Sequence, residues 1–346
     1  MTTCGFGEAA RDDIEHLPLT GSVSRLFKYF EAIALRTRLY SLAYRWHPRS
    51  REARRALRGR TFNAVLANDF DTVEVAQEIV APQHVHADLH EYFPGLHDQN
   101  PAWVRLRKPF LDWILRRYVV PVGSVTTVSD TIASRYEAEY GFAPGVVRNA
   151  APLASLSPTP VGARIRLVHS GVAQENRRIE VMMQAAARSK TPVTLDLYLT
   201  GVGSDYHRSL MALADDLGDR VTVHPPVPQR DLVGVLNAHD VGVFILPDTN
   251  TNYRLALPNK FFDYVQARLA LVISPTVDME RLLRKHDLGI VAQGAGVEDV
   301  VTAFDQLAVE DVKRWKQHAD AAAAENSAEA QNPVWEAAVA ARMAER

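Results

Sequence analysis

A lysine stands at an unexpected place in the stretch LALPNKFFDYVQARLALVIS, which runs from residue 255 to residue 274. Pro258 suits the first turn of a helix, because its φ is fixed and it has no N–H to leave unpaired. Lys260 follows in that turn, where the interaction of a cation with the helix dipole is unfavourable by roughly 0.3–1 kcal/mol. The position makes chemical sense if an anion lies between the lysine and the free N–H groups.

An acid follows one helical turn after this lysine. The carboxylate of Asp263 offers two acceptor oxygens, which suit the two hydroxyls of a vicinal diol. The simpler interpretation is an acid near the helix N-terminus that complements the dipole.

A second candidate anion site begins where the apolar stretch RIRLVHSG ends, at Gly171. A glycine-ended strand leading into a helix N-terminus lets the backbone approach an anion closely. Arg177 stands at the start of the following helix and would add a cation at the same edge. Arg178 is an alternative to it, since only one of two adjacent side chains can face that edge.

Short apolar stretches alternate with helical ones through the second half of the chain. The predicted strands lie in RIRLVHSG, TLDLYLTG, RVTVHPPV, DVGVFILP, LALVISPT and LGIVAQG. Helices are expected near residues 177–189, 205–217, 229–238 and 277–285, and over the stretch that contains Lys260. This alternation is typical of βαβ units, and the continuously apolar strands are typical of a parallel sheet buried on both faces.

The first half repeats this pattern less completely, with predicted strands in FNAVLAND, QHVHADLHEY, SVTTVSD and GVVRNAAP and a long helix near 103–119. We therefore predict an α/β chain of two Rossmann-like parallel-sheet domains that face each other across a cleft. The expected divisions are a first domain at 1–150, a Pro-, Ser- and Gly-rich linker at 151–163 and a second domain at 164–310. The alanine-rich tail, 311–346, is expected to form helices that break at Pro333 and pack back on the first domain.

Length and composition narrow the class of protein. The chain has 346 residues, of which 47% are hydrophobic and 23% charged, enough for about two buried cores. A formal net charge of -2 disfavours nucleic acid as a partner. Cys4 is the single cysteine, so no internal disulfide can form. With no signal-peptide pattern and no apolar run of about 20 residues, we expect a cytoplasmic protein.

Basic residues gather in one segment of the chain. Between Gly21 and Arg60 there are eleven Lys or Arg against two acids, with aromatic residues interleaved. A second basic and aromatic stretch runs from Trp103 to Tyr118. One interpretation is a face that binds an anionic membrane surface, peripherally on its cytoplasmic side. The other is a set of solvated helices whose arginines lie along apolar surface.

The stretch around Lys260 resembles the donor-binding segment of GT-B glycosyltransferases, particularly the retaining family numbered four (group 1). Three stretches of the first half, NDFDT, DLHEYFP and TVSD, are similar to loops that this family places at the cleft. The order agrees from about residue 61 to 295. The resemblance implies transfer of a sugar, of hexosyl type, from a nucleotide-diphosphate donor to an acceptor on the first domain, with retention. A lipid-linked acceptor or a cell-envelope glycan would suit the basic segment.

The resemblance also implies roles for residues of the second domain. Lys260, Arg177 and Gly171 would bind the donor diphosphate, and Asp263 would accept hydrogen bonds from the ribose. Family members often carry a second acid eight positions before this one, where the present chain has Leu255. That contact with the sugar is then absent or supplied differently.

In the first domain the resemblance places His90 beside the transferred sugar, as a positioning residue that acts through its side chain or its carbonyl. It follows a predicted strand, and Asp88 or Glu91 would orient it. Further cleft positions are Asn68, Asp69, Ser129 and Asn259.

The stretch NDFD contains an Asp-x-Asp pair, which binds a divalent metal in a different glycosyltransferase architecture. Here it lies between a predicted strand and a helix, where Asp71 followed by Thr72 is expected to cap the helix. In GT-B enzymes, cations and helix dipoles neutralise the diphosphate. The resemblance therefore implies neither a metal nor any cofactor besides the nucleotide sugar.

The opening of the chain departs from the family. GT-B first domains begin with a strand and a glycine-bearing loop, whereas MTTCGFGEAA resembles the second strand of such a domain. We therefore expect the first strand to be missing. That departure favours one alternative function, a non-catalytic GT-B protein that binds a partner or a membrane. A second alternative, a sugar-nucleotide epimerase, would require a set of cleft carboxylates.

Overall fold

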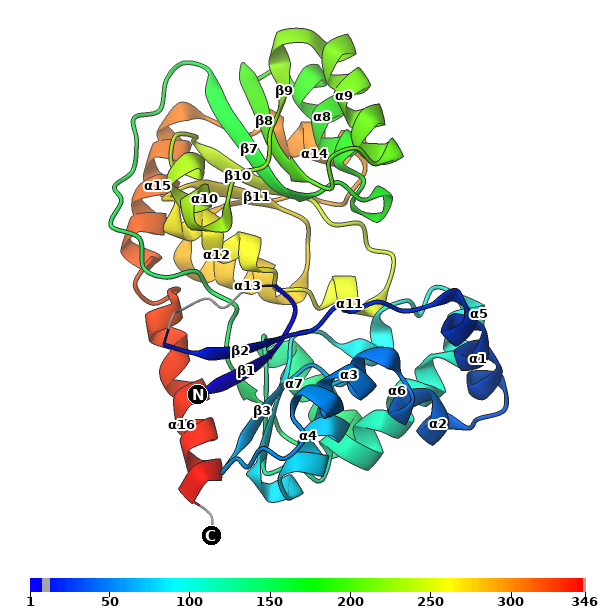
Figure 1. Ribbon diagram of the computed structural model, residues 1–346. Helices are drawn as coiled ribbons and strands as arrows, with labels where there is room; N and C mark the ends of the chain where they lie inside the picture. Colours follow the sequence, from blue (N-terminus) through cyan, green and yellow to red (C-terminus); the bar gives the residue numbers. More distant parts are fainter. Residues whose placement is uncertain (8–12, 345–346) are drawn as a thin grey trace. The chain divides into compact units, whose positions relative to one another are not determined.

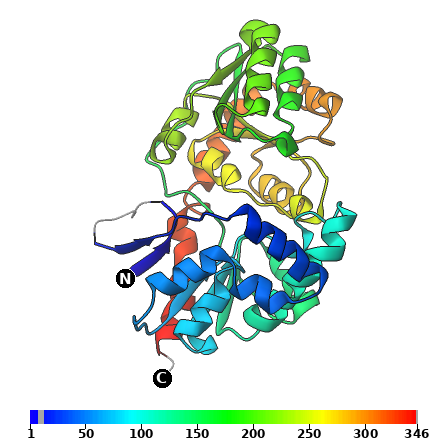
Figure 2. The ribbon, with the colours of Figure 1, turned by 45° about the vertical axis from the view of Figure 1, so that its right-hand side comes forward.

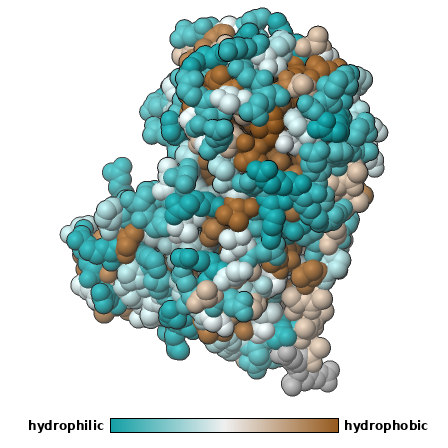
Figure 3. Space-filling model, turned by 180° about the vertical axis from the view of Figure 1, so that it is seen from behind, coloured by the Kyte–Doolittle hydropathy of each residue, from teal (hydrophilic) through white to brown (hydrophobic). Residues whose placement is uncertain are grey.

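The computed structural model describes residues 1–7 and 13–344, and the chain divides into two compact units (Figure 1). The first unit contains Met1–Val147 and Val334–Arg346, and the second contains Arg148–Pro333. Residues 8–10 of the opening stretch and 345–346 of the tail lie outside the described residues. Hydrophilic residues cover most of the face shown in Figure 3, with hydrophobic residues visible between them. No helix in the described part of the chain is long and apolar enough to cross a membrane.

The first unit is built on a parallel sheet with the strand order β3-β4-β5-β6. Its strands are β3 (Val65–Asn68), β4 (Val85–Leu89), β5 (Ser124–Thr127) and β6 (Gly145–Val146). The helices α4 (Val73–Ile79) and α7 (Asp130–Tyr140) follow β3 and β5. Asn68 pairs with Asp88 in the register of β3 and β4. The polar residues that follow these two strands therefore gather at one edge of the sheet.

The basic segment of this unit forms several helices, α1 (Arg25–Arg36), α2 (Tyr40–Arg45) and α3 (Pro48–Ala56). Figure 2 shows α1 as the dark blue helix of this unit. Arg38, at φ 58°, adopts the left-handed conformation between α1 and α2, which ends continuous helix there. Leu35 and Tyr44 pack in a hydrophobic core with Phe110 and Ile114, so α1 and α2 are anchored by their apolar residues.

The long helix predicted near residues 103–119 is divided in the structure. It consists of α5 (Pro101–Leu106), α6 (Lys108–Ile114) and a π-helical turn, η3 (Leu115–Val119). Pro109 lies in the first turn of α6. Because proline has no N–H and clashes with the carbonyl one turn earlier, it suits a helix start and prevents continuation from α5.

The opening residues form a small sheet of their own. β1 (Thr2–Gly5) and β2 (Glu15–Pro18) are parallel neighbours, separate from the sheet of β3 to β6. Both Nη atoms of Arg60 donate to the Glu15 carboxylate, at 2.6 and 2.7 Å, and so attach β2 to the end of the basic segment. The stretch MTTCGFGEAA therefore does contain a strand, but that strand does not extend the main sheet.

The second unit has a parallel sheet with the order β12-β11-β10-β7-β8-β9. Its strands are β7 (Ile165–Val172), β8 (Val193–Thr200), β9 (Val221–His224), β10 (Val241–Phe244), β11 (Ala270–Ile273) and β12 (Gly289–Val291). From β7 the sheet grows one way to β8 and β9, and the other way to β10, β11 and β12. Ligands of such sheets bind at this switch point, outside the carboxyl ends of the strands.

Helices cover both faces of this sheet, as Figure 1 shows. One face carries α8 (Ile179–Arg188), α9 (Asp205–Leu217) and α14 (Val297–Asp305). The other carries α10 (Gln229–Leu236), α12 (Asn259–Gln266) and α13 (Val277–His286), with the short α11 (Thr251–Arg254) before α12. Short 3-10 turns are η1 (Pro82–His84), η2 (Phe93–Gly95), η4 (Glu175–Arg177) and η5 (Gly218–Arg220). The predicted alternation of strands and helices is thus confirmed.

The tail differs from the expectation in two respects. α15 (Val309–Ala322) belongs to the second unit, where it buries Val312 and Trp315 in the core, whereas residues Val334–Arg346 of the tail belong to the first unit. α16 (Ala328–Ala344) continues through Pro333, where a break was expected. Contacts on either side hold this helix, because Gln331 accepts a hydrogen bond from the N–H of Arg148 and Trp335 packs edge-on against His86.

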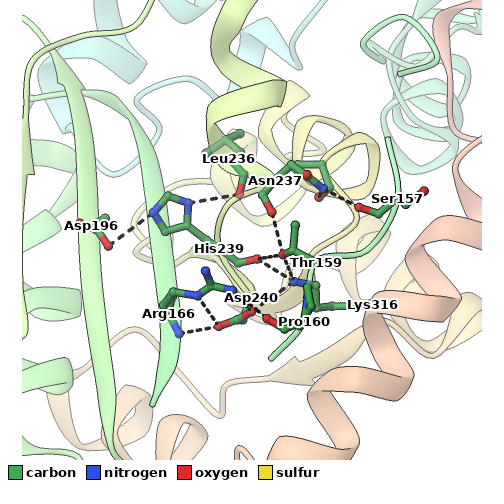
Figure 4. Close-up of polar contacts among 11 residues, drawn as sticks. Ser157, Thr159, Pro160, Arg166, Asp196, Leu236, Asn237, His239, Asp240 and Lys316 are labelled. Carbon is green, nitrogen blue, oxygen red and sulfur yellow. Dashed lines mark hydrogen bonds and ion pairs between the residues drawn. The ribbon is translucent and has the colours of Figure 1, made fainter. Parts of the chain in front are cut away.

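A buried carboxylate joins the amino-terminal edge of the second sheet (Figure 4). Asp240, just before β10, is fully buried and accepts hydrogen bonds from the backbone N–H (2.9 Å) and the guanidinium (2.8 and 3.0 Å) of Arg166 in β7. The buried Lys316 of α15 donates to Asp240 (3.2 Å), to the carbonyl of His239 (2.7 Å) and to Thr159 of the linker (2.9 Å). Burial opposes ionisation of Asp240, but the hydrogen bonds from Arg166 hold its pKa below the ordinary value. Strand, linker and helix are therefore joined through one charge.

Replacing Asp240 by Asn should lower the free energy of unfolding by about 3–5 kcal/mol, because Lys316 would stay buried without its counter-charge. Chemical denaturation at pH 7 would measure the change. Folding lowers the pKa of Asp240. The parent's higher free energy of unfolding should therefore be lost as the pH falls below 3.8, the pKa in the unfolded state, and through the lower pKa of the folded state. Asp231→Asn, at an exposed position of α10, is the control and should change stability by less than about 0.5 kcal/mol. Equal stability of the two variants would contradict the assigned importance of the network.

Candidate functional site

The carboxyl end of β7 meets the start of α12 at Gly171 and Lys260. A Cβ added to Gly171 would lie 3.0 Å from Cε and 3.7 Å from Nζ of Lys260. It would also lie 3.1 Å from Nε2 of His169. The absence of a side chain at Gly171 therefore lets the lysine extend across the end of the strand. The structure brings together two residues that the sequence predicted for one anion site.

Lys260 is half-buried and makes no hydrogen bond or ion pair with the described residues. Its ammonium lies over the ring of Phe244, with Nζ 5.9 Å from the ring centroid. Burial lowers the pKa of Lys260, Arg177 lowers it further, and Asp263 offsets part of this effect. The first turn of α12 has no acidic residue and no side-chain cap. This helix end is therefore positive from both dipole and lysine, and is suited to an anion.

Of the two adjacent arginines, Arg177 is the one near Lys260. Its guanidinium carbon lies 5.1 Å from the centroid of the Tyr253 ring, and its charge lowers the pKa values of both Lys260 and His169. Arg178 is exposed, occupies the N-cap of α8 with φ 49°, and forms an ion pair with Glu180 at 3.9 Å. The local turn thus directs the two side chains to different surroundings.

Asp263 is buried inside α12, with 2% of its surface exposed, and no hydrogen bond to its carboxylate occurs within the described chain. Burial raises its pKa to about 6, and the nearby Lys260 lowers it only in part. Most buried acids are paired or hydrogen-bonded. This carboxylate therefore has unused acceptor capacity, which the hydroxyls of a ligand can satisfy.

A histidine of β7 belongs to the same site, although sequence analysis did not select it. His169 is buried, and its Nδ1 lies 2.9 Å from the carbonyl oxygen of Val243, so Nδ1 carries the donated proton. Burial lowers the pKa of His169 to about 4, and Lys260 and Arg177 act in the same direction. The ring is therefore neutral, with Nε2 as an acceptor toward Gly171. A polar residue within the apolar run RLVHSG was the available signal.

The remaining predicted residues of the second unit contribute less. Asn259 is exposed at the first position of α12, and Leu255 stands at the end of α11, so neither supplies a carboxylate. The site is thus made of two cations, Lys260 and Arg177, with one acceptor, Asp263, at the carboxyl edge of a parallel sheet. Such a set can bind a diphosphate and a pair of hydroxyls together.

In the first unit His90 lies between two carboxylates. Its Nδ1 is 3.2 Å from Oδ1 of Asp69, and its Nε2 is 3.4 Å from Oδ2 of Asp88. The same Asp69 oxygen accepts the backbone N–H of His90 at 3.1 Å. The hydrogen bonds to Asp69 and Asp88 raise the pKa of His90 to about 10. The ring is therefore a cation at neutral pH and cannot serve as a general base there.

Asp69 and Asp88 both contact the His90 ring, so Asp69 joins Asp88 as an orienting residue, whereas the sequence pattern indicated Asp88 or Glu91 for that role. At φ 61° Asp69 is left-handed, and its N–H donates to the carbonyl of Asp88 at 2.8 Å. This turn directs its carboxylate toward His90. Glu91 is exposed, and its carbonyl accepts a hydrogen bond from Tyr136 at 2.8 Å. Asn68 ends β3 at an exposed position.

The expected cap at Asp71 is wrong. α4 begins after Thr72, whose hydroxyl donates back to the carbonyls of Asn68 (2.8 Å) and Asp69 (3.1 Å), and no side chain caps the helix. The left-handed turn at Asp69 moves the helix start beyond Asp71. Ser129 is buried and caps α7, accepting the N–H of Ile132 at 3.3 Å. Across residues 1–7 and 13–344, no three His, Cys, Asp or Glu side chains are grouped to hold a metal ion.

Two Rossmann-like parallel-sheet units, one with a candidate anion site at its strand ends, are typical of GT-B glycosyltransferases. A family model described as glycosyl transferases group 1 matches residues 164–340. The chain therefore belongs to this family, and the resemblance seen in its sequence is confirmed. Among curated proteins, none matches the sequence.

Solved GT-B structures are similar to this chain. HepE from Anabaena, in complex with UDP and glucose, is 12% identical with a TM-score of 0.67, and the match covers 98% of this chain and 99% of HepE. The UDP-forming trehalose-phosphate synthase of Burkholderia xenovorans, in complex with glucose-6-phosphate, is 10% identical with a TM-score of 0.64, covering 96% and 88%. A TarM mutant of S. aureus is 9% identical with a TM-score of 0.65. That match covers 85% of this chain but 59% of TarM, so the chain spans 59% of that protein's length. Identities this low are evidence for the fold, and the predicted GT-B fold is confirmed.

Replacing Asp263 by Asn should stabilise the protein by roughly 1–3 kcal/mol at pH 7.5. The unfolded state binds fewer protons than the folded state between the unfolded pKa of 3.8 and the folded pKa of about 6, so parent stability falls as the pH rises through that window. Thermal melts of both proteins at pH 7.5 and at pH 4 would test this, and the gain should disappear at the lower pH. A variant that is less stable at pH 7.5 would show that Asp263 has a favourable partner.

Proposed function

We propose that this protein transfers a hexosyl group from a nucleotide-diphosphate sugar to an acceptor held by the first unit, with retention at the anomeric carbon. The bond from that carbon to the diphosphate breaks, and a bond to the acceptor oxygen forms on the same face. The acceptor proton passes to the leaving diphosphate. The observation that supports this proposal most is the unpaired Lys260 across Gly171 at the start of α12.

In this proposal each residue of the second unit has one task. Lys260, Arg177 and the N–H groups at the start of α12 stabilise charge that develops on the leaving diphosphate. Asp263 accepts hydrogen bonds from the ribose hydroxyls, which lie within reach when the diphosphate occupies the helix end. The UDP complex of HepE supports a nucleotide sugar as donor.

The proposed tasks of the first unit concern position. His90 holds the transferred sugar through its backbone carbonyl, because both of its ring nitrogens are engaged by Asp69 and Asp88. Asn68, Glu91 and Ser129 stay candidate positions beside the acceptor. Since no residue acts as a general base in this scheme, catalysis rests on orientation and charge stabilisation.

UDP should bind the parent protein, and Lys260→Ala and Arg177→Ala should each weaken binding by about 1.5–3 kcal/mol through loss of a charge-assisted hydrogen bond. That loss corresponds to roughly ten- to a hundredfold in Kd by isothermal calorimetry. Arg178→Ala is the matched control, because it removes the adjacent exposed charge, and its Kd should stay near that of the parent.

If UDP and the other nucleoside diphosphates fail to bind the parent, or if Arg178→Ala weakens binding as much as Arg177→Ala, the donor site is wrongly assigned. A parent that binds UDP but transfers no sugar to any acceptor would instead fit the non-catalytic alternative. Turnover of a UDP-sugar into its epimer without an acceptor would fit the epimerase.

We further propose that α1 docks this protein on an anionic membrane surface, where a lipid-linked acceptor would be found. Leu26, Tyr29 and Ile33 recur at helical spacing on one side of α1 and are 79%, 67% and 45% exposed. Arg25 and Arg36 flank them, are exposed, and have no ion pair among the described residues. Apolar side chains bordered by unpaired cations suit the interface of an anionic bilayer.

Replacing Arg25 and Arg36 together by Gln should weaken binding to phosphatidylserine vesicles by about 2 kcal/mol, roughly thirtyfold, since each surface cation contributes about 1 kcal/mol. Co-sedimentation at low and high salt would measure this, with release expected at high salt. The matched control is Lys190→Gln with Arg230→Gln, two exposed cations of the second unit. Equal binding to neutral and anionic vesicles would remove this proposal.

A further inference from the structure

The first unit contains a polar cavity that none of the proposed roles uses. Its volume is about 580 Å³, within the range of pockets that hold small molecules. The side chains of Lys28 and Glu31 from α1 line it, together with His47, Arg49 and Arg107. These residues come from three separate parts of the chain, so only folding brings them together.

One wall of this cavity is a fixed and neutral ion pair. Both Nη atoms of Arg107 donate to the carboxylate oxygens of Glu31, at 2.7 and 2.8 Å. Glu31 is largely covered, with 13% of its side chain exposed, so the fork geometry is held in place. The charges of these two residues compensate each other.

Two other cations of the cavity have no ion-pair partner among the described residues. Lys28 makes no hydrogen bond or ion pair with the described residues. Arg49 donates Nε to the carbonyl of Gly21 at 3.3 Å and lies over the ring of Phe6. It forms no ion pair in the described part of the chain, although its charge lowers the pKa of Asp71. Among the side chains that line the cavity, Glu31 and Arg107 cancel, so the excess positive charge of the lining comes from Lys28 and Arg49.

His47 completes the cavity with a neutral ring. It packs edge-on against Phe27, with ring centroids 5.3 Å apart, and its ring nitrogens have no hydrogen-bond partner within the described chain. Burial lowers the pKa of His47, the charges of Arg49 and Arg107 lower it further, and Glu31 opposes them. His47 is half-buried, and a ring nitrogen without a protein partner is an available donor or acceptor for a ligand.

We propose that this cavity binds a phosphate monoester, with Lys28, Arg49 and His47 on the phosphate oxygens. A dianion matches the two positive charges of Lys28 and Arg49, neither of which is held in an ion pair in the described chain, and guanidinium and ammonium groups are the usual donors to phosphate. The volume leaves room for a body the size of a sugar or a polyol beside the phosphate. Resting on the proposed function, this ligand would be the acceptor or its phosphorylated end.

The test uses glycerol 3-phosphate and the ring resonances of His47 by NMR, in the Lys260→Ala/Arg177→Ala variant, so that phosphate cannot bind the second unit. Glycerol 3-phosphate should shift the His47 resonances and raise its pKa, because an added negative charge favours the imidazolium. Adding Lys28→Gln and Arg49→Gln should weaken the response at least roughly tenfold. The matched control adds Arg51→Gln and Arg55→Gln, two exposed cations of α3, and should keep it.

A second arm distinguishes a soluble ester from a lipid headgroup. A His47 response to glycerol 3-phosphate assigns the cavity to soluble esters. A response to phosphatidic acid vesicles alone, with no response to glycerol 3-phosphate or to control vesicles of phosphatidylcholine, assigns it to a lipid headgroup. No His47 response to either probe, or a response that survives Lys28→Gln/Arg49→Gln in a variant with an unchanged melting temperature, overturns the proposal. UDP binding by the parent is measured separately, so failure of the donor site and failure of this cavity are distinguishable.

Discussion

The ion pair between Asp240 and Lys316 is the interaction on which the second unit depends. It sits at the amino-terminal edge of the sheet and attaches α15 and the linker to β7 and β10, with Arg166 as a third partner. Because β7 and β10 are parallel neighbours, fixing their beginnings also fixes where they end. Gly171 and the loop that leads to Lys260 are therefore positioned by charges at the opposite edge.

The two edges of this sheet use charge in opposite ways. At the amino-terminal edge the buried charges are paired, and burial is compensated by hydrogen bonds. At the carboxyl edge the half-buried Lys260 and the buried Asp263 lack such partners. Burial lowers the pKa of Lys260 and raises that of Asp263, which favours the neutral form of each. A protein retains groups in that condition where a ligand supplies the missing partners, and this contrast is the physical basis for placing the donor site there.

Charge in the first unit follows a third pattern. His90 is held as a cation by Asp69 and Asp88, whereas His47 is kept neutral by burial beside Arg49 and Arg107. Both are histidines on connecting segments, and only their neighbours separate their protonation states. A unit that combines a fixed imidazolium with a cavity lined mainly by cations is suited to anionic or hydroxyl-rich ligands.

Local sequence was sufficient for most of the elements and for part of the candidate site. The apolar runs and their period predicted the parallel strands, and α9 covers the predicted residues 205–217. The Pro-Asn-Lys start of α12 and the acid that follows it pointed to Lys260 and Asp263. These features depend on backbone propensity and helical spacing, which act over a few residues.

Other decisions required contacts between distant residues. The choice of Arg177 over Arg178, the inclusion of His169, the pairing of His90 with Asp69, the continuation of α16 through Pro333 and the basic cavity are of this kind. Tertiary structure alone decided them, because burial, charge and left-handed turns depend on which residues the fold places side by side.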